Sequence, residues 1–292
     1  MEQTQGTQQT PRKRRISKRN RVKRRIRRRL ILFVLLVCGV WILANNIRSE
    51  PESEVQEIVV EIPLVYEFNN DGFETGSGVR QSFARFNGQE RRFVYLTFDD
   101  GPSEFLPQIL DILRAYDVQA TFFMIGNTFA SPETHDIVRR VIAEGHYIGV
   151  HSMTHSYRRL YTQGYAVQEM IEAQRLLGEI IGFRPRLVRF PYGSEAGLTE
   201  AMRDEAYAAG LRMWDWTVDS EDWLHPDDPD KVLEITLEQI HGNREVILFH
   251  EMEVTIIVLP ALIEHLQARG YEIRAYREER HFVLNHFNDD RF

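Results

Sequence analysis

Residues 93–102 have the sequence FVYLTFDDGP, and this stretch decides the fold. Its first six residues are aromatic, β-branched or leucine, which is typical of a β-strand. Asp99 and Asp100 follow at once, and the Gly-Pro pair after them is a turn signal that ends the strand. The pattern predicts a buried strand with two adjacent carboxylates at its C-terminal end.

Strands of this kind alternate with amphipathic segments along the rest of the chain. The strand-like runs are 93–98, 120–125, 147–150, 187–190, 211–216, 246–249 and 271–274. The helical patterns cover 107–116, 133–144, 166–181, 199–209, 229–241 and 259–269. Such alternation predicts a parallel sheet, and seven strand units favour an α/β fold, a (β/α)7 distorted TIM-like barrel. We place this domain at residues 89–280 and a C-terminal tail at 281–292.

Ionisable or metal-binding side chains follow five of these strands. They are Asp99 and Asp100, then His151 and His155, then Arg189 and Tyr192, then Asp219 with Trp223, and finally His250. Polar residues are common where a strand reaches solvent. A barrel of this type, however, carries its chemistry at the C-terminal ends of its strands, so five such clusters at that end predict an active site.

The HSMTH sequence at 151–155 predicts a metal site. Two imidazoles four residues apart share one face of a helical turn, although such a pair can arise by chance in a chain with ten histidines. With Asp100 they form an Asp-His-His set with open coordination positions, which suits a hydrolytic divalent cation. Zinc fits this set, and cobalt, manganese or nickel would fit it too.

Three further motifs have a structural interpretation beside the functional one. Arg189 in RFPYG could pair with Asp99, or could lie in solvent at a strand end that a Pro-Tyr-Gly turn closes. Asp219 and Asp222 in TVDSEDW could form an acidic surface loop. His250 ends a buried strand, where a lone histidine is more often simply hydrogen-bonded than catalytic.

Taken in chain order, the motifs TFDDGP, HSMTH, RFPYG, DSEDW and LFH resemble the NodB-type polysaccharide deacetylases of carbohydrate esterase family 4. The ATFFMIG and ARGYEI segments are also similar, and the resemblance covers roughly residues 92–274. No catalytic position is substituted, and Glu251 stands where the family often carries Asp. The resemblance implies a metal-dependent hydrolase of amide bonds that removes N-acetyl groups from a cell-wall aminosugar polymer, most closely peptidoglycan N-acetylglucosamine.

The resemblance also implies how the reaction begins. Asp100, His151 and His155 would hold the divalent cation, which activates a water molecule as the nucleophile. Asp99 would take the proton of that water as general base. The cation and the Arg189 guanidinium would both keep this carboxylate ionised.

The remaining roles concern the oxyanion, the leaving group and the acetyl pocket. The backbone N–H of Tyr192 would stabilise the oxyanion, and this residue would also contact substrate. His250 would protonate the departing amine, with Asp219 holding its tautomer. Leu248 and Trp223 would wall the pocket for the acetyl methyl group.

The N-terminal part predicts a membrane anchor. Thirteen Lys and Arg lie between residues 12 and 29 with no acidic residue among them, and residues 30–47 are eighteen uncharged positions, enough to span a bilayer. Basic residues stay inside, so we expect a cytoplasmic tail at 1–29, a single-pass anchor at 30–47, an extracytoplasmic stem at 48–88 and an outer catalytic domain at the cell membrane. A cleaved signal peptide is the alternative, but no small-x-small site follows.

Charge and cysteine content narrow the class of protein. From Leu30 onward there are 23 basic and 42 acidic residues, and an acidic body argues against a nucleic-acid partner. Cys38 is the single cysteine and lies in the predicted span, so the outer domain has no disulfide. The expected partners are a cell-wall polysaccharide and the membrane. Chitin, xylan or a lipid-linked sugar is the alternative substrate, and an inactive glycan-binding homologue is the alternative class.

Overall fold

Strand β3 (Arg92–Gly101) contains the FVYLTFDDGP stretch up to its glycine and lies at the centre of the main sheet. The computed structural model describes residues 85–86 and 89–292. Along β3, side chains on both faces of the strand are buried, Leu96 and Phe98 on one face and Tyr95 and Thr97 on the other. The predicted strand at 93–98, with Asp99 and Asp100 at its C-terminal end, is therefore confirmed.

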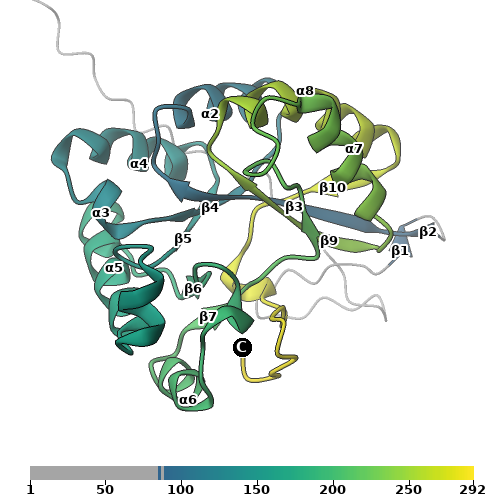
Figure 1. Ribbon diagram of the computed structural model, residues 1–292. Helices are drawn as coiled ribbons and strands as arrows, with labels where there is room; N and C mark the ends of the chain where they lie inside the picture. Colours follow the sequence, from purple (N-terminus) through teal and green to yellow (C-terminus); the bar gives the residue numbers. More distant parts are fainter. Residues whose placement is uncertain (1–84, 87–88) are drawn as a thin grey trace, which may run out of the picture. The chain divides into compact units, whose positions relative to one another are not determined.

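The other strands of the main sheet all run parallel to β3. They are β4 (Thr121–Met124), β5 (Tyr147–Val150), β6 (Leu187–Val188), β7 (Arg212–Met213), β8 (Val218–Asp219), β9 (Arg244–His250) and β10 (Tyr271–Ile273). Their order is β7-β6-β5-β4-β3-β9-β8, and β10 pairs with the first residues of β3 (Figure 1). Because the strands are parallel, their C-terminal ends meet at one edge, where the functional side chains were expected.

The parallel α/β sheet forms a half-barrel, whereas a closed or nearly closed, distorted TIM-like barrel was predicted. Its end strands β7 and β8 do not pair with each other in the part of the chain that is described. Only two residues of the predicted run 211–216 form a strand, and β8, which was not predicted, is equally short. Strands of two residues carry no readable alternation, so the sequence pattern could not define this side of the sheet.

Helices alternate with the strands as predicted. They are α2 (Leu106–Ala115), α3 (Gly126–Phe129), α4 (His135–Ala143), α5 (Ala166–Ile181), α6 (Glu200–Ala208), α7 (Pro229–Gln239) and α8 (Glu253–Ala268). Short 3-10 segments lie at Pro132–Thr134, Ser194–Ala196 and Glu278–Arg280, and a π-helical turn at Arg158–Thr162. The largest error concerns α8, which begins six residues before the predicted start at Leu259. Proline favours the first helical turn, but Pro260 lies inside this helix.

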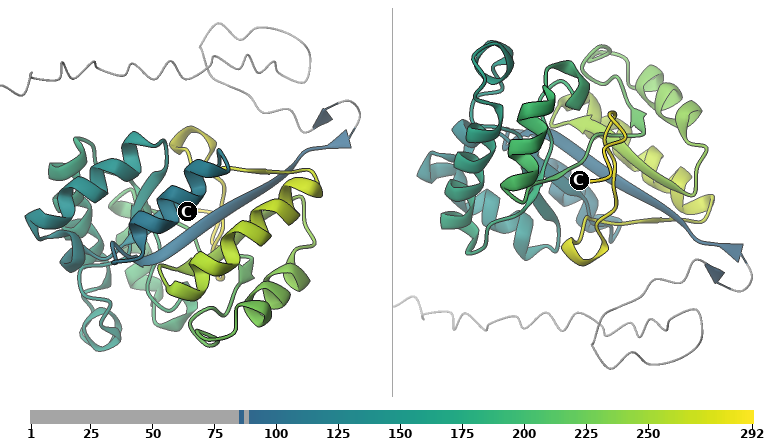
Figure 2. Two further views of the ribbon diagram at one scale, coloured as in Figure 1. Left: turned by 90° about the horizontal axis from the view of Figure 1, so that it is seen from above. Right: turned by 90° about the horizontal axis from the view of Figure 1, so that it is seen from below.

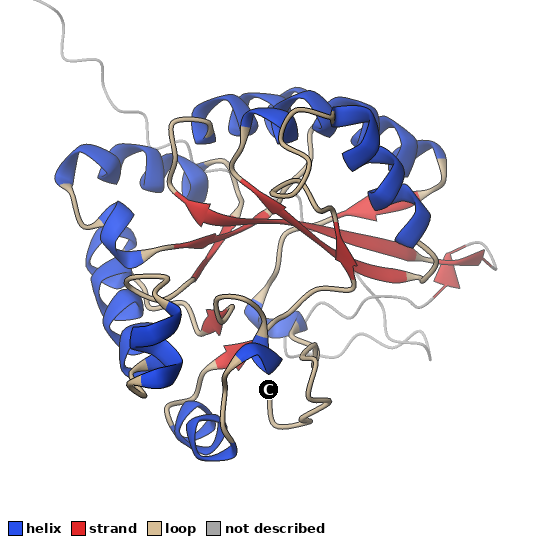
Figure 3. Ribbon diagram, viewed as in Figure 1, coloured by secondary structure: helices blue, strands red, loops and turns tan. Residues whose placement is uncertain are grey.

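The helices lie around the outside of the strands (Figure 3). α2 and α8 pack side by side over β3 (Figure 2). Leu106, Ile109, Leu110 and Leu113 of α2 are buried in the larger of two apolar clusters, which joins the helices to the sheet. This packing fixes the helices and strands, so the loops at the C-terminal edge start from a rigid frame.

A second cluster lies around Trp214 and Tyr95, whose rings meet edge to face at 5.2 Å. The C-terminal segment contributes to it, because Trp214 Nε1 donates to the Phe282 carbonyl at 2.9 Å and Trp214 forms a bridge with Leu284. Residues 281–292, predicted to be a tail beyond the domain, therefore pack against the strand end that the half-barrel leaves open.

The N-terminal predictions mostly lie outside the described residues. The basic tail at 1–29, the anchor at 30–47 and nearly all of the stem at 48–88 belong to this part. A two-stranded antiparallel hairpin, β1 (Arg85–Phe86) with β2 (Gln89–Glu90), precedes β3. Among the described helices, none has the length and apolar character needed to cross a bilayer.

Candidate active site

A cavity of about 600 Å³ opens at the C-terminal edge of the sheet. Its lining comprises Asp99, Asp100, Ser103, His151, His155, Tyr192, Trp216, Asp219, Trp223, Leu248, His250, Glu251 and Met252. All the side chains of four of the five predicted strand-end clusters line the cavity. In the fifth cluster, Tyr192 lines the cavity and Arg189 lies directly behind it. The structure therefore brings together the residues that the strand-end rule predicted.

The two adjacent aspartates both face this cavity, although successive side chains of a strand point to opposite faces. The pairing of β3 with β4 shifts register between Asp99 and Gly101, and Asp100 has a φ of 70°. This local bulge turns the second carboxylate back toward the first. Asp99 is buried at 3% exposure, whereas the side chain of Asp100 is 41% exposed.

Asp100, His151 and His155 form a set that could hold a metal ion. Asp100 Oδ1 lies 3.6 Å from His151 Nε2 and 3.4 Å from His155 Nε2, and the three ligand atoms lie within 4.8 Å of one another. Asp100 Oδ1 is buried and has no hydrogen-bond partner, which is costly for a carboxylate oxygen unless a cation completes its surroundings. One carboxylate, two imidazoles and an open side fit a catalytic divalent cation such as zinc.

His151 is prepared for this role by its second nitrogen. Its Nδ1 lies 2.8 Å from the carbonyl oxygen of Arg189, so Nδ1 carries the proton and Nε2 is left with its lone pair toward Asp100. Burial lowers the pKa of His151 to about 3, although the charge of Asp100 opposes this shift. The imidazole is therefore neutral at physiological pH, as metal binding requires.

The two histidines do not lie on a helical turn, and this part of the prediction was wrong. Residues 151–156 form a loop in which Ser152 and His155 have φ values of 66° and 54°. The Ser152 hydroxyl accepts a hydrogen bond from the His155 N–H at 2.9 Å and closes a tight turn. This turn brings the centroids of the two imidazole rings within 5.0 Å of each other. The two histidines therefore lie close together as predicted, but in a loop and not on a helix.

Glu169 of α5 holds the metal loop, residues 151–156, in place. This glutamate was not predicted from the sequence. Its carboxylate is buried and accepts hydrogen bonds from the N–H groups of Met153 at 3.2 Å and Thr154 at 3.0 Å. Arg159 Nε donates to the other carboxylate oxygen at 2.6 Å. Helix periodicity predicts an apolar residue at such a buried position, so no sequence signal marked this glutamate.

Arg189 pairs with Asp99 rather than lying in solvent. The guanidinium is completely buried and its Nη1 donates to Asp99 Oδ1 at 2.8 Å. Its other donors bind the Thr97 hydroxyl and the carbonyl oxygens of Trp214 and Asp215. Burial raises the pKa of Asp99 while the charges of Arg189 and His250 oppose the shift, so this carboxylate is a stronger base than an exposed one.

His250 is held by Asp222, and the prediction that Asp219 does so was wrong. Asp222 Oδ1 lies 2.7 Å from His250 Nδ1, and Asp222 Oδ2 accepts from the His250 N–H at 2.7 Å and the Thr255 hydroxyl at 2.8 Å. Burial by itself lowers the pKa of His250, but the hydrogen bond and charge of Asp222, with Asp99 and Asp100, outweigh it and raise that pKa to about 9. Asp222 is completely buried, so it is not part of a surface loop.

Asp219 has a different place. Its carboxylate accepts the Glu221 N–H at 3.0 Å, and Gln239 bonds both its backbone N–H and its carbonyl. It lines the cavity near Trp223, which is 55% exposed, and the buried Leu248. Residues 219–222 make a sharp turn with Glu221 at a φ of 54°, and this turn decides which aspartate reaches His250.

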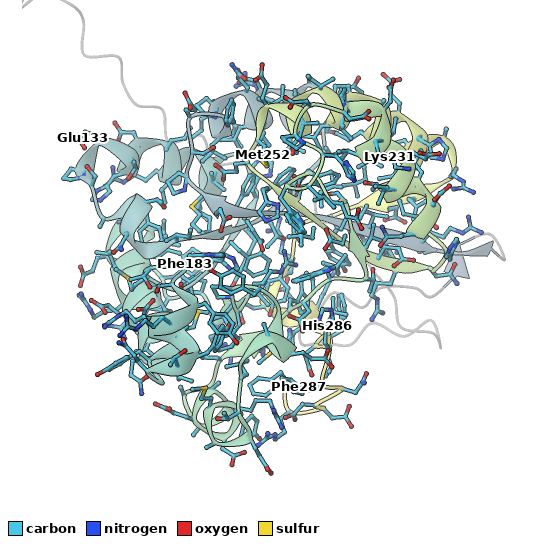
Figure 4. All side chains as sticks on the ribbon, viewed as in Figure 1. Glu133, Phe183, Lys231, Met252, His286 and Phe287 are labelled. Atoms are coloured by element: carbon cyan, nitrogen blue, oxygen red, sulfur yellow. The ribbon has the colours of Figure 1, made fainter. Side chains whose placement is uncertain are left out.

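Tyr192 begins the turn after β6 and has a φ of 68°. The turn is fixed from behind by the buried Asp215, which accepts from the Ser194 N–H at 2.9 Å and from the Ser194 hydroxyl at 2.5 Å. Asp215 also accepts the His286 N–H at 2.7 Å from the C-terminal segment that Figure 4 labels at His286 and Phe287. The role of Asp215 was not predicted, because its hydrogen-bond partners come from segments that are distant in sequence.

The cavity wall beyond His250 was also not predicted. Glu251 accepts the Ser103 N–H at 2.6 Å, and burial raises the pKa of Glu251 to about 7 although Ser103 opposes the shift. Met252, labelled in Figure 4, follows at the N-terminal end of α8. The Glu251 carboxylate packs closely against Gly101, since a Cβ at this position would lie 1.9 Å from Glu251 Oε1 and would displace that side chain.

A pH profile distinguishes the two aspartates near His250. As a general acid His250 must be protonated, so the rate should fall as pH rises through about 9, the pKa of this group. Asp222→Asn removes the charge that raises this pKa, and we expect the falling limb of kcat/KM against pH to move to lower pH. Asp219→Asn is the matched control and should leave the limb near its original position. An unmoved limb in Asp222→Asn would contradict the pairing.

The comparisons with known proteins agree with this geometry. The polysaccharide deacetylase family profile matches residues 87–214. A peptidoglycan-N-acetylglucosamine deacetylase of Bacillus cereus is 43% identical over 71% of this chain and 78% of its own length. A chitooligosaccharide deacetylase of Bradyrhizobium is 33% identical over 67% of this chain and 93% of its own length.

A crystal structure shows the same fold. The polysaccharide deacetylase Bc1974 from Bacillus cereus superposes with a TM-score of 0.67 at 41% identity, covering 69% of this chain and all of that one. Sequence and structure thus point to the same group of enzymes as the strand-end motifs do. The chain belongs to the polysaccharide deacetylase family of carbohydrate esterase family 4, and it is a hydrolase that acts on amide bonds.

Proposed function

We propose that this deacetylase removes the N-acetyl group from N-acetylglucosamine residues of peptidoglycan and releases acetate. One observation carries the proposal. A metal-ligand set of Asp100, His151 and His155 lies in the same cavity as a buried carboxylate, Asp99, and a histidine, His250, whose pKa Asp222 raises. The relative with 43% identity is named as a peptidoglycan-N-acetylglucosamine deacetylase, which supports this polymer.

The metal site fits a divalent cation, because Asp100 Oδ1 is a buried oxygen without a partner beside two imidazoles whose Nε2 atoms face it. A bound cation would supply Lewis acidity, which favours deprotonation of water and polarises an amide carbonyl. Zinc is the cation we propose, and cobalt, manganese or nickel are alternatives that a site of one carboxylate and two imidazoles can also bind.

Asp99 is assigned as the general base and His250 as the general acid, because their surroundings affect the two groups differently. Asp99 accepts the proton of the attacking water, and Arg189 holds its carboxylate in a fixed orientation at 2.8 Å. His250 donates its proton to the departing amine, since the buried Asp222 keeps it cationic. The backbone N–H of Tyr192 stabilises the oxyanion that forms on the amide carbonyl.

The acetyl methyl group fits the apolar part of the cavity. Leu248 lies on β9 two residues before His250 and faces the cavity, and Trp223 borders the same space. Trp216 adds a third apolar surface that the sequence analysis did not name. An apolar wall beside the acid and base favours an acyl group as small as acetyl.

A second substrate class has its own support. The Bradyrhizobium relative is named as a chitooligosaccharide deacetylase, and peptidoglycan and chitin both contain the N-acetylated sugar that the cavity would bind. Chitin oligomers are therefore the alternative substrate to measure beside peptidoglycan.

The substrate panel tests this proposal. The purified protein is incubated with peptidoglycan, chitin oligomers or acetylated xylan, and released acetate is measured with and without a chelator. We expect acetate from peptidoglycan at the highest rate, and loss of that rate with the chelator. A higher rate on chitin oligomers would make chitin the preferred substrate in place of peptidoglycan. If none of the three substrates releases acetate, the proposed function is contradicted.

We also propose that the enzyme is a single-pass protein of the cell membrane with a cytoplasmic N-terminus. Support comes from the eighteen uncharged residues at 30–47 and the basic flank before them. A peptidoglycan substrate outside the membrane agrees with an extracytoplasmic domain. Membrane fractionation with sequencing of the mature N-terminus tests this, and a mature chain that starts near residue 45 would contradict it.

A further inference from the structure

Two exposed tyrosines lie against each other beside the active site. Tyr157 is 48% exposed and Tyr192 is 51% exposed, and their ring centroids are 5.6 Å apart. Tyr192 lines the cavity, whereas Tyr157 lies beyond it. Large aromatic rings that stay exposed next to a substrate cavity are a feature of ligand-binding surfaces.

Both rings are fixed by their hydroxyl groups. The Tyr157 hydroxyl donates to the Ala196 carbonyl at 2.9 Å, and the Tyr192 hydroxyl donates to the His155 carbonyl at 2.9 Å. Neither hydroxyl is therefore needed in solvent, and what each residue presents is mainly its ring. Their rotamers are already ordered in the folded protein, so a ligand that packs on them loses little side-chain entropy.

A third tyrosine supports Tyr157 from behind. Tyr161 meets the Tyr157 ring edge to face at 5.1 Å, and its hydroxyl donates to the Pro191 carbonyl at 2.6 Å. Gly197 makes room for it, because a Cβ there would lie 2.3 Å from Tyr161 Cγ. The exposed ring of Tyr157 thus rests on packed residues and not on a mobile side chain.

The aromatic surface is continuous with the metal site. His155 packs on Tyr192 with centroids 4.7 Å apart, and Tyr192 packs in turn on Tyr157. A polymer chain whose N-acetyl group is in the cavity must continue over the neighbouring surface. The C–H-rich face of a pyranose ring is apolar and flat, so it matches an exposed aromatic ring without any charge.

We propose that Tyr157 forms a second sugar subsite, which binds a neighbouring pyranose ring of the polymer whose N-acetyl group occupies the cavity. This inference rests on the proposed function for its choice of ligand. A subsite outside the cavity makes binding depend on oligomer length. It leaves the chemistry on a single sugar largely unchanged, because Tyr157 is not among the residues that line the cavity.

The test compares a short and a long N-acetylglucosamine oligomer. For Tyr157→Ala we expect kcat/KM on the long oligomer to fall on the order of tenfold, mainly through KM, with little change on the shortest substrate that is turned over. Tyr157→Phe keeps the ring and should stay near the parent rate. Tyr207→Ala is the matched control, since Tyr207 is 53% exposed on α6 and lies outside the cavity lining.

A binding measurement separates the subsite from the proposed function. Calorimetric titration of the long oligomer into His250→Ala, with and without Tyr157→Ala, needs no turnover. Weaker binding in the double variant supports the subsite even if the parent releases no acetate, and absent acetate would count against the proposed function alone. Equal binding, equal losses on short and long oligomers, or a change in oligomeric state in sedimentation as the only effect of Tyr157→Ala would overturn the subsite.

Discussion

His151→Ala and His155→Ala are each expected to abolish both bound metal and acetate release. Either change leaves Asp100 with one imidazole, and two protein ligands hold a divalent cation poorly. We expect complete loss of metal and activity in His151→Ala. The Arg189 carbonyl fixes this imidazole through Nδ1, so that Nε2 faces Asp100 at 3.6 Å as a metal ligand. Metal content by elemental analysis and acetate release by the same sample give the result.

The control for these variants is His241→Ala. His241 is exposed and lies before β9, at the end of that strand opposite to His250, so its loss should change neither metal content nor rate. Circular dichroism should show an unchanged fold in all three variants. Full activity in a His151 or His155 variant that is demonstrably free of metal would end the metal mechanism.

Asp99→Asn should reduce kcat on the order of 10²- to 10⁴-fold, the usual contribution of a general base. Asparagine keeps an oxygen for the 2.8 Å hydrogen bond from Arg189 Nη1, so the buried guanidinium retains a partner. The metal ligands are unchanged, and metal content should therefore stay at the parent level. Single-turnover rates with peptidoglycan, together with elemental analysis, measure both quantities.

The matched comparison for Asp99→Asn is Asp219→Asn. Asp219 also lines the cavity, but its carboxylate accepts the Glu221 N–H and it has no assigned part in proton transfer. Its rate should fall much less. If Asp99→Asn keeps the parent kcat while metal remains bound, another group takes the proton and Asp99 has only a structural part.

The sequence predicted the site well where strand position alone decides where a side chain lies. Asp99, Asp100 and His250 end β3 and β9, neighbouring parallel strands that pair up to the register of Asp99 with His250. Parallel strands bring their C-terminal ends to one edge, so a pattern of buried runs followed by polar residues was enough. Arg189 was recovered for the same reason, although its burial was not.

The prediction failed where loop conformation decides. Asp219 and Asp222 lie three residues apart, and the turn at Glu221, with its positive φ, directs Asp222 to His250. Nothing in an acidic loop sequence reveals such a backbone. The helical turn expected for the two histidines failed for a similar reason, because Ser152 and His155 adopt left-handed conformations.

Buried carboxylates that hold loops in place could not be predicted from the sequence either. Glu169 and Asp215 hold the metal loop and the turn after Tyr192, each by hydrogen bonds to backbone N–H groups of another segment. Their partners become neighbours only after folding. Composition and periodicity describe which residues are buried, but they do not describe which buried carboxylate serves which loop.

Titration of the metal-depleted enzyme with zinc tests the central claim most directly. Chelated and dialysed protein is mixed with increasing zinc, and acetate release from purified peptidoglycan is recorded against the zinc bound per chain. We expect negligible release without metal and full recovery when about one ion is bound at Asp100, His151 and His155. Undiminished acetate release by protein shown to contain no divalent metal would contradict it.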